Sequence, residues 1–474
     1  MKTTKWTMTR WLIACLLVLA CCFVLGACAE TDTDLPVETG SDTEATTTEA
    51  APTYLNLTID GVDIGEYDIV YAHSPMENKI SSTGKTIGVD LGAYLLGEEI
   101  GYDFDYQTAV RLQTLIKEAT GKTLDLVKDT VGVKTDYEIL VGATNRAETE
   151  TLKDTLAFDK FLCKMEGTRY LICGKDYGTT WHAVDEWEET LTKAVTDGES
   201  SLDMKTVGDL SGEYAMKKVA CVGDSITRGS QAVYAQGADV TSWGSAKVRD
   251  IYYEEYLAYP CVAQRNLWQD YLFYNFGASG ASMSLGGTLY QKTAKYELCM
   301  EYSAREDFAY DLVLIMLGSN DANGASPKND GTLIDSQLTS YINATKKLMN
   351  DILVGSPNAK FVMMNVPHRC DGENPRATDA AVRWAQNETV YELLGEGFPV
   401  WSFDMNRFTI ENLTADPTKE GTDELKLHED YYNIKEGAND TTHLNNKGYY
   451  LVGMEMIKVV EYILDEGDGS DYLS

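Results

Sequence analysis

The chain has 474 residues, of which 44% are hydrophobic, enough for a large core and for two or three domains. It carries 74 acidic against 40 basic residues, a formal net charge of −34. A surface this acidic repels nucleic acid and anionic lipid head groups. Composition therefore argues against a nucleic-acid-binding protein and mildly against a phospholipid substrate, and it favours neutral or cationic partners.

The first segment has the pattern of an export signal. Lys2, Lys5 and Arg10 precede an uncharged apolar run, Trp11 to Ala27, that ends in small residues. This run is at the short limit for a membrane-spanning helix, so we expect residues 1–27 to be a cleaved signal peptide. The sequence Leu-Gly-Ala before Cys28 resembles the lipobox of bacterial lipoproteins. That resemblance implies a lipidated Cys28 and an exported protein anchored by lipid at the bacterial cell surface.

Residues 28–52 are predicted to be a disordered tether. After Cys28 they are rich in Thr and acidic residues and contain no aromatic residue, so they cannot bury enough apolar surface to fold. The remaining cysteines show neither C-x-x-C nor zinc-type Cys/His spacing, and we expect buried thiols, no disulfide framework and no metal or other cofactor. These cysteines are Cys163, Cys173, Cys221, Cys261, Cys299 and Cys370.

Residues 53–210 read as a first, smaller α/β unit. Asp60-Gly61 joins two alternating runs and predicts a hairpin over 55–64. A helix is expected over 106–121, a buried strand over 137–142, a second hairpin over 159–174 and an amphipathic helix over 179–195. The stretch Glu138–Arg146, EILVGATNR, resembles the non-catalytic N-terminal domain of hexosaminidases and α-glucuronidases, which implies an accessory domain. His73 and His182 are isolated and are expected to be structural or surface residues.

Residues 211–474 alternate between short apolar runs and helical patterns. Alternation of this kind predicts a parallel sheet covered by helices on both faces, with a functional site at the carboxyl ends of the strands. The five apolar runs are KKVACVG (217–223), DYLFYNFG (270–277), YDLVLIMLG (310–318), AKFVMMNVP (359–367) and FPVWSFD (398–404).

Four short motifs follow the strands or precede the last helix. They are Gly223-Asp224-Ser225, Asn275 to Gly280, Gly318-x-Asn320-Asp321 and Asp440-x-x-His443. Each alone is ordinary turn or helix-cap chemistry. Together and in this order they resemble the SGNH-hydrolase family, also called GDSL esterases. The resemblance covers about residues 217–464 and implies a flavodoxin-like sheet sandwiched by helices.

The chemistry of ester hydrolysis explains these residue types. A serine hydroxyl needs a base to accept its proton as it attacks, and His443 is the candidate base for Ser225. Asp440, three residues earlier, is the candidate partner for the imidazole Nδ1–H. The family resemblance assigns the oxyanion hole to the backbone N–H groups of Ser225 and Gly280 and to the side-chain amide of Asn320.

The sequence thus predicts a surface-anchored serine esterase that removes O-acyl groups, chiefly acetyl, from carbohydrate. A lipase or lysophospholipase and a catalytically silent glycan-binding protein are the alternatives. His368 follows the fourth apolar run and could reach a substrate, although a solvent-facing loop histidine is the commoner case, and His428 has no visible role. Residues 228–260 form an insertion whose aromatic residues suit sugar rings or simply pack onto the core: Tyr234, Trp243, Tyr252, Tyr253, Tyr256 and Tyr259.

Overall fold

The computed structural model describes residues 54–72, 79–80, 86–87, 104–132, 135–229, 258–371, 374–413, 431–435, 438–444 and 446–466. The predicted signal peptide, Cys28, the tether, His73, His428 and most of the aromatic insertion lie outside these residues. Within them, no helix combines the length and the apolar character that crossing a membrane requires.

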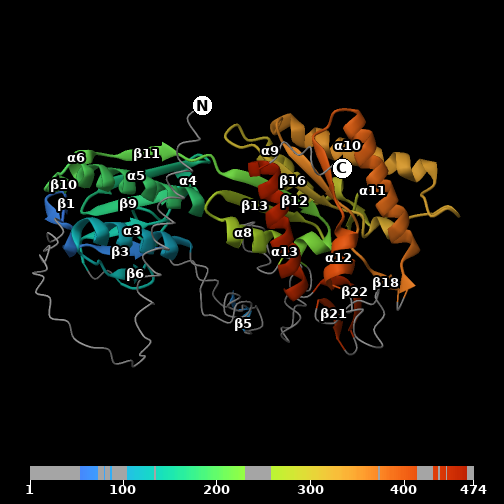
Figure 1. Ribbon diagram of the computed structural model, residues 1–474, viewed down its shortest axis with the longest axis horizontal. Coiled ribbons are helices and arrows are strands. Elements are labelled where there is room, and N and C mark those ends of the chain that lie inside the picture. Colours follow the sequence, from blue (N-terminus) through green and yellow to red (C-terminus); the bar gives the residue numbers. More distant parts are fainter. Residues whose placement is uncertain are drawn as a thin grey trace, which may run out of the picture. The chain divides into compact units, whose positions relative to one another are not determined.

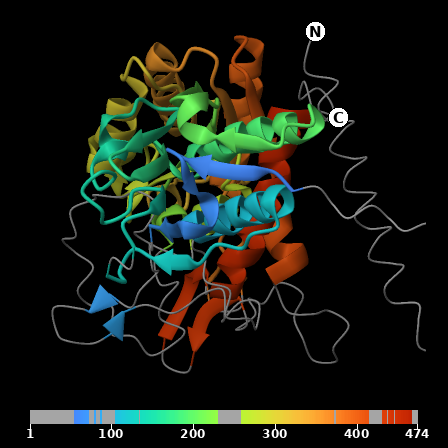
Figure 2. The same cartoon turned by 90° about the vertical axis from the view of Figure 1, so that its left-hand side faces the viewer.

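The first α/β part is built on a six-stranded sheet of order β11-β8-β9-β7-β3-β6. β3, β6, β7 and β9 run parallel; at one edge β8 pairs antiparallel with β9, and β11 pairs antiparallel with β8. Helices α3 and α5 pack on one face and bury Leu112, Ile116 and Trp187 against the strands; Figure 2 shows α3 in cyan and α5 in green. The bounds are β3 Asp68–Tyr71, α3 Phe104–Thr120, β6 Leu126–Lys128, β7 Glu138–Val141, α4 Leu152–Thr155, β8 Lys160–Glu166, β9 Arg169–Gly174, α5 Tyr177–Thr196, α6 Met204–Val207 and β11 Leu210–Glu213.

Both predicted hairpins of this part are confirmed. β1 (Asn56–Ile59) pairs with β2 (Val62–Asp63) through Asp60 and Gly61, whose φ angles of 52° and 75° are those of a tight hairpin turn. β8 and β9 form the second hairpin. β3, β6, β11 and β10 (Ser201–Asp203), which joins β1, were not predicted. β11 spans the predicted boundary at 210/211, because it pairs with β8 of the first sheet.

The second part confirms the predicted fold class. Its five strands lie in the order β13-β12-β16-β17-β20, all parallel, and each one falls in a predicted apolar run. Val219 and Cys221 of β12 face the core under α8, α12 and α13, whereas Ala220 and Val222 face the core under α9, α10 and α11 (Figure 1). The bounds are β12 Lys217–Gly223, α8 Tyr259–Leu267, β13 Tyr271–Gly277, α9 Ala294–Ser303, β16 Leu312–Met316, α10 Asp335–Gly355, β17 Lys360–Met364, α11 Ala377–Gly395, β20 Val400–Phe403, α12 Met405–Leu413 and α13 Asn446–Glu461.

The strand order marks the place where a site is expected. β13 lies on one side of β12 and β16 on the other, so the chain reverses its direction of travel across the sheet at β12. In parallel sheets ligands bind beyond the carboxyl ends of the strands at such a reversal. The ends of β12 and β16 carry Ser225 and Asn320.

Two-stranded ribbons complete the described strands. They are β4 (Lys79–Ile80) with β5 (Thr86–Ile87), β14 (Ala281–Ser282) with β15 (Thr288–Leu289), β18 (Cys370–Asp371) with β19 (Asn374–Pro375), and β21 (Tyr432–Lys435) with β22 (Ala438–Leu444). The cysteines whose side chains are described are all free thiols, and four of the five are buried, as expected: Cys163, Cys173, Cys221 and Cys299.

Candidate active site

Ser225 stands where the chain leaves the sheet. It is the first residue of α7 (Ser225–Arg228), directly after Gly223 and Asp224 at the carboxyl end of β12. Asp224 is the N-cap of α7, because its Oδ1 accepts a hydrogen bond of 2.9 Å from the backbone N–H of Ile226. The serine is half-buried, so its hydroxyl sits at the surface of the domain on a capped turn.

Two glycines allow α7 to lie this close to the strands. A Cβ on Gly223 would come within 1.9 Å of Oγ1 of Thr227, and a Cβ on Gly277 would come within 2.2 Å of the backbone N of Arg228. Asn275 on β13 also binds α7, because its Nδ2 donates to the carbonyl of Thr227 at 3.0 Å. The second sequence motif therefore supports the turn that carries Ser225.

His443 meets Ser225 across the site. Its Nε2 lies 2.7 Å from Oγ of Ser225, although the two residues are 218 positions apart in the chain. This is the separation that a general base needs in order to accept the hydroxyl proton. His443 lies on β22, and Ser225 follows β12, so the pair joins the start and the end of the second part.

An irregularity in the β21–β22 ribbon surrounds His443. Tyr432 pairs with Leu444, and Ile434 pairs with Asn439, so a single residue of β21 (433) faces four residues of β22 (440–443). This irregular stretch contains both Asp440 and His443. A bulge frees side chains from the strict alternation of a strand and often re-aims a side chain next to an active site. The backbone of Asp440 is on β22, and its side chain lies outside the described residues.

The three expected oxyanion donors lie at the same edge of the sheet. Gly280 has a φ of 76° and is solvent-exposed on the loop after β13, and Asn320 follows β16. Among the described residues, the backbone N–H groups of Ser225 and Gly280 have no hydrogen-bond acceptor. Nδ2 of Asn320 donates to the carbonyl of Ala281 at 2.8 Å and lies 3.5 Å from Oδ2 of Asp224. The second distance is long for a hydrogen bond, so the amide hydrogen directed at Asp224 is the one that an oxyanion could accept.

Asp224 is a charged group buried beneath the site. It has no exposed surface, and burial raises its pKa to about 6, against the opposing effects of the Ile226 N–H, Arg369, His443 and Ser319. The carboxylate thus touches the helix of Ser225 with one oxygen and approaches the amide of Asn320 with the other. The motif Gly223-Asp224-Ser225 was noted in the sequence, but no role was predicted for Asp224 itself.

A second buried group supports the loop after β16. Arg369 pairs with Asp379 through Nε–Oδ2 and Nη2–Oδ1 distances of 2.9 and 2.5 Å, and its Nη2 also donates to the carbonyl of Ser319 at 2.9 Å. Both partners are almost fully buried. A bidentate pair of this kind fixes a planar geometry, so the ion pair sets the position of the peptide before Asn320.

His368 does not face the solvent, and that prediction is wrong. The residue is 3% exposed; its backbone N–H donates to Oγ1 of Thr409, and its carbonyl accepts the hydroxyl of Tyr432 on β21. The loop after β17 is turned inward because α12 and β21 supply partners for its backbone. His182 is also buried, in agreement with the structural role expected for it. Tyr259, the described aromatic residue of the predicted insertion, has no exposed surface and packs in the core.

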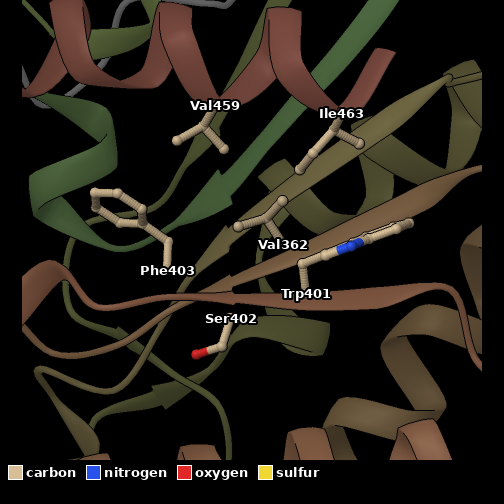
Figure 3. Close-up of a pocket in the computed structure, with 6 residues that line it drawn as sticks. All are labelled: Val362, Trp401, Ser402, Phe403, Val459 and Ile463. Carbon is tan, nitrogen blue, oxygen red and sulfur yellow. The ribbon is translucent and has the colours of Figure 1, made fainter. Parts of the chain in front are cut away.

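A small apolar hollow elsewhere in the second part is a different feature (Figure 3). It lies between β17, β20, the last turn of α13 and the residues directly after it, where Val459 and Ile463 face Val362. Its other lining residues are Trp401, Ser402 and Phe403. The hollow contains no histidine or carboxylate that could activate Ser402, so it does not compete with the Ser225 site.

The sequence model of a family described as GDSL-like Lipase/Acylhydrolase matches residues 219–456, about half of the chain. No curated protein matches.

Solved structures to which the chain is similar include several esterases. One is a family two carbohydrate esterase from Clostridium thermocellum in complex with cellohexaose, with 17% identity, 54% of this chain and 70% of that chain covered, and a TM-score of 0.33. Another is Est24, a carbohydrate acetylesterase from Sinorhizobium meliloti, with 18% identity, 52% and 100% covered, and a TM-score of 0.31. A third is the aryl esterase of M. smegmatis, with 15% identity, 52% and 100% covered, and a TM-score of 0.32. Similarity this distant says nothing about the substrate of the present chain.

Proposed function

The chain belongs to the GDSL-like lipase/acylhydrolase family, and from this we propose that it is a serine esterase that removes O-linked acyl groups, chiefly acetyl, from carbohydrate. Ester hydrolysis follows from the family. The observation that supports Ser225 as the nucleophile is the 2.7 Å distance from its Oγ to Nε2 of His443 at the strand reversal.

The proposed reaction uses one proton shuttle. His443 accepts the hydroxyl proton through Nε2 as Oγ of Ser225 attacks the acyl carbon. The backbone N–H groups of Ser225 and Gly280 and the amide of Asn320 stabilise the resulting oxyanion. The imidazolium of His443 then protonates the leaving sugar oxygen, and the C–O ester bond breaks to give an acyl-serine. A water molecule, deprotonated by His443, releases the acid and restores Ser225.

Asp440 completes the proposed triad. A carboxylate at Nδ1–H of His443 would hold the imidazole in the tautomer that presents a lone pair at Nε2, and it would stabilise the imidazolium. The bulge at 440–443 supports this role, because it places both residues in one irregular stretch.

The loops around the site support a small acyl group and a polar substrate. The exposed positions after Gly280 and Asn320 include Gly287, Thr288, Asn323 and Ser326, which are small or polar. Met283, the largest apolar residue directly after Gly280, has no exposed surface and belongs to the core. A long acyl chain would gain about 0.8 kcal/mol for each CH₂ only where apolar walls receive it.

Anchoring is part of the proposal and rests on the sequence alone. A lipidated Cys28 and the tether of residues 28–52 would hold the enzyme at the cell surface, where polysaccharide is available. The acidic composition supports a neutral glycan over nucleic acid or anionic lipid as partner.

Chain-length dependence and acetate release test the substrate. We expect kcat/KM to fall steadily from acetyl to butyryl to octanoyl esters of p-nitrophenol, and acetate to be released from at least one of acetylated xylan, mannan, pectin or peptidoglycan. Faster cleavage of the octanoyl ester would favour a lipase or lysophospholipase. Absence of cleavage of every ester would favour a silent glycan-binding protein.

A further inference from the structure

Asp321, the last residue of the Gly-x-Asn-Asp motif, makes an unusual set of contacts. Its side chain has no exposed surface. Its Oδ2 accepts the backbone N–H of Met283, and its Oδ1 accepts those of Ser284 and Leu285, all at 2.7 Å. Three consecutive amides therefore converge on one carboxylate, with distances typical of charge-assisted hydrogen bonds.

The loop held in this way begins at Gly280. The carbonyl of Ala281 accepts Nδ2 of Asn320 at 2.8 Å, and the carbonyl of Gly280 accepts the N–H of Thr288 at 3.1 Å. Glycines bring the two loops into backbone contact, since a Cβ on Gly324 would lie 1.7 Å from the carbonyl oxygen of Leu285. The loop after β13 and the turn after β16 thus form one joined unit with Asp321 at its centre.

Burial and hydrogen bonding act on this carboxylate in opposite directions. Burial raises the pKa of Asp321, and the three backbone N–H groups oppose that rise. A carboxylate can accept all three N–H groups, whereas an amide in its place would turn an NH₂ donor toward at least one of them. Unpaired buried donors are costly, so an amide at position 321 would release part of the loop.

We propose that Asp321 is a positioning residue that sets the separation between the oxyanion donors of Gly280 and Asn320. The inference rests on the proposed function, in which these two donors stabilise the transition state. Asp321 itself need not touch the substrate. It acts through the backbone on both sides, because it neighbours Asn320 in the chain and fixes the segment that follows Gly280.

The kinetic test is Asp321→Asn, with rates expressed per active site titrated by a fluorophosphonate. Removing one oxyanion donor typically costs about 10²–10³ in rate, so displaced donors are expected to cost about 10–100-fold in kcat with KM changed by no more than about threefold. The matched control is Asp176→Asn, in which the exchanged carboxylate caps α5 in the first part. The control is expected to keep the wild-type kcat. An Asp321→Asn enzyme with wild-type kcat would overturn the proposal.

A double-mutant cycle separates positioning from general destabilisation. If Asp321 acts through the oxyanion donors, its replacement should lower kcat at least fivefold less in an Asn320→Ala background than in the wild type, since coupled residues are not additive. Equal losses in both backgrounds would mean a merely structural role.

Hydrogen exchange gives a readout that does not need activity. The amides of Met283, Ser284 and Leu285 should exchange at least tenfold faster in Asp321→Asn, and unchanged protection would contradict the proposal. If Asp321→Asn does not fold, Asp321→Ser is used, whose small hydroxyl still accepts hydrogen bonds. A wild-type enzyme that the fluorophosphonate does not label would instead refute the proposed function, while the exchange measurement would still report on the loop.

Discussion

Around Ser225, helix α7 can pack close to the sheet because glycines occupy the contact positions. Gly223 and Gly277 occupy positions where a methyl group would collide with Thr227 and with the backbone of Arg228. The motif that contains Gly277 was recognised in the sequence. Its packing role could not be predicted, because Gly277 ends β13 whereas the helix it contacts, α7, follows β12. Likewise Asp321 was visible as part of a motif, whereas its three amide partners come from another loop.

Gly277→Ala is therefore expected to displace the nucleophile. Overpacking of this kind typically costs about 1–3 kcal/mol in the free energy of unfolding, and kcat should fall with it because Ser225 moves away from His443. The matched control is Gly395→Ala at the end of α11, where a Cβ meets nothing within 4 Å. The control should be neutral or stabilising by about 0.4–1 kcal/mol. Urea unfolding measures the stability of both variants, and ester hydrolysis measures their kcat. Equal stability and activity in the two variants would contradict the packing argument.

At the scale of elements, the five parallel strands of the second part were predicted because they are continuous apolar runs in the sequence, whereas β3 of the first part is also apolar and parallel but was missed. β12, β13, β16, β17 and β20 all have this character. The short strands β6, β10 and β11 are mostly polar or half-buried, and only their neighbours make them strands, so no local pattern marks them. The bulge that carries His443 could not be predicted from the sequence either, because a bulge is defined by how two strands pair and not by the sequence of one.

The ribbon of β21 and β22 is tied to the loop after β17 by Tyr432, whose hydroxyl donates to the carbonyl of His368 at 3.0 Å. Tyr432→Phe should cost about 0.5–1.5 kcal/mol in stability and lower kcat severalfold, because the ribbon positions His443. Tyr67→Phe removes an equivalent buried hydrogen bond, to Ile59 in the first part, and should cost similar stability without loss of kcat. Urea unfolding and steady-state kinetics give the stability and the kcat of the two variants. An equal effect of both substitutions on kcat would exclude the positioning role of the ribbon.

At the scale of the whole molecule, residues from Tyr54 onward form one unit by their contacts. The first sheet meets the second through buried polar groups. Nζ of Lys218 on β12 lies 2.7 Å from both carboxylate oxygens of Asp159, and the ring of His182 on α5 stacks on Tyr214 at 3.4 Å. Lys218 is 4% exposed, whereas the side chain of Asp159 is 25% exposed, so the pair joins a buried ammonium to a half-buried carboxylate.

His182 makes this junction sensitive to pH. Its Nδ1 lies 2.7 Å from Asp185 and its Nε2 lies 3.0 Å from the carbonyl of Gln269, with Asp270 at 3.4 Å. All these oxygens are acceptors, so these contacts favour the protonated ring, in which both nitrogens donate. Burial alone would lower the pKa of His182, but the hydrogen bonds and charges of Asp185 and Asp270 outweigh it and raise the pKa.

A raised folded-state pKa stabilises the protein below the unfolded value of about 6.5, and that stability is lost as pH rises through the folded value. The free energy of unfolding should therefore fall from pH 6 to pH 8, by about 1.4 kcal/mol for each pKa unit between the two states. His182→Gln should be less stable at pH 6 and should lose this slope. Urea titrations at both pH values test it, and an identical slope in the variant would contradict the protonated junction.

The central claim is that Ser225 is a nucleophile activated by His443. Its most direct test is the reaction of the full chain with a fluorophosphonate, followed by peptide mass mapping. The wild type should be modified at Ser225 alone, and Ser225→Ala should be neither modified nor active. His443→Ala should react slower by about 10³-fold or more, because the base is gone. Modification or near-normal ester hydrolysis in Ser225→Ala would contradict the account.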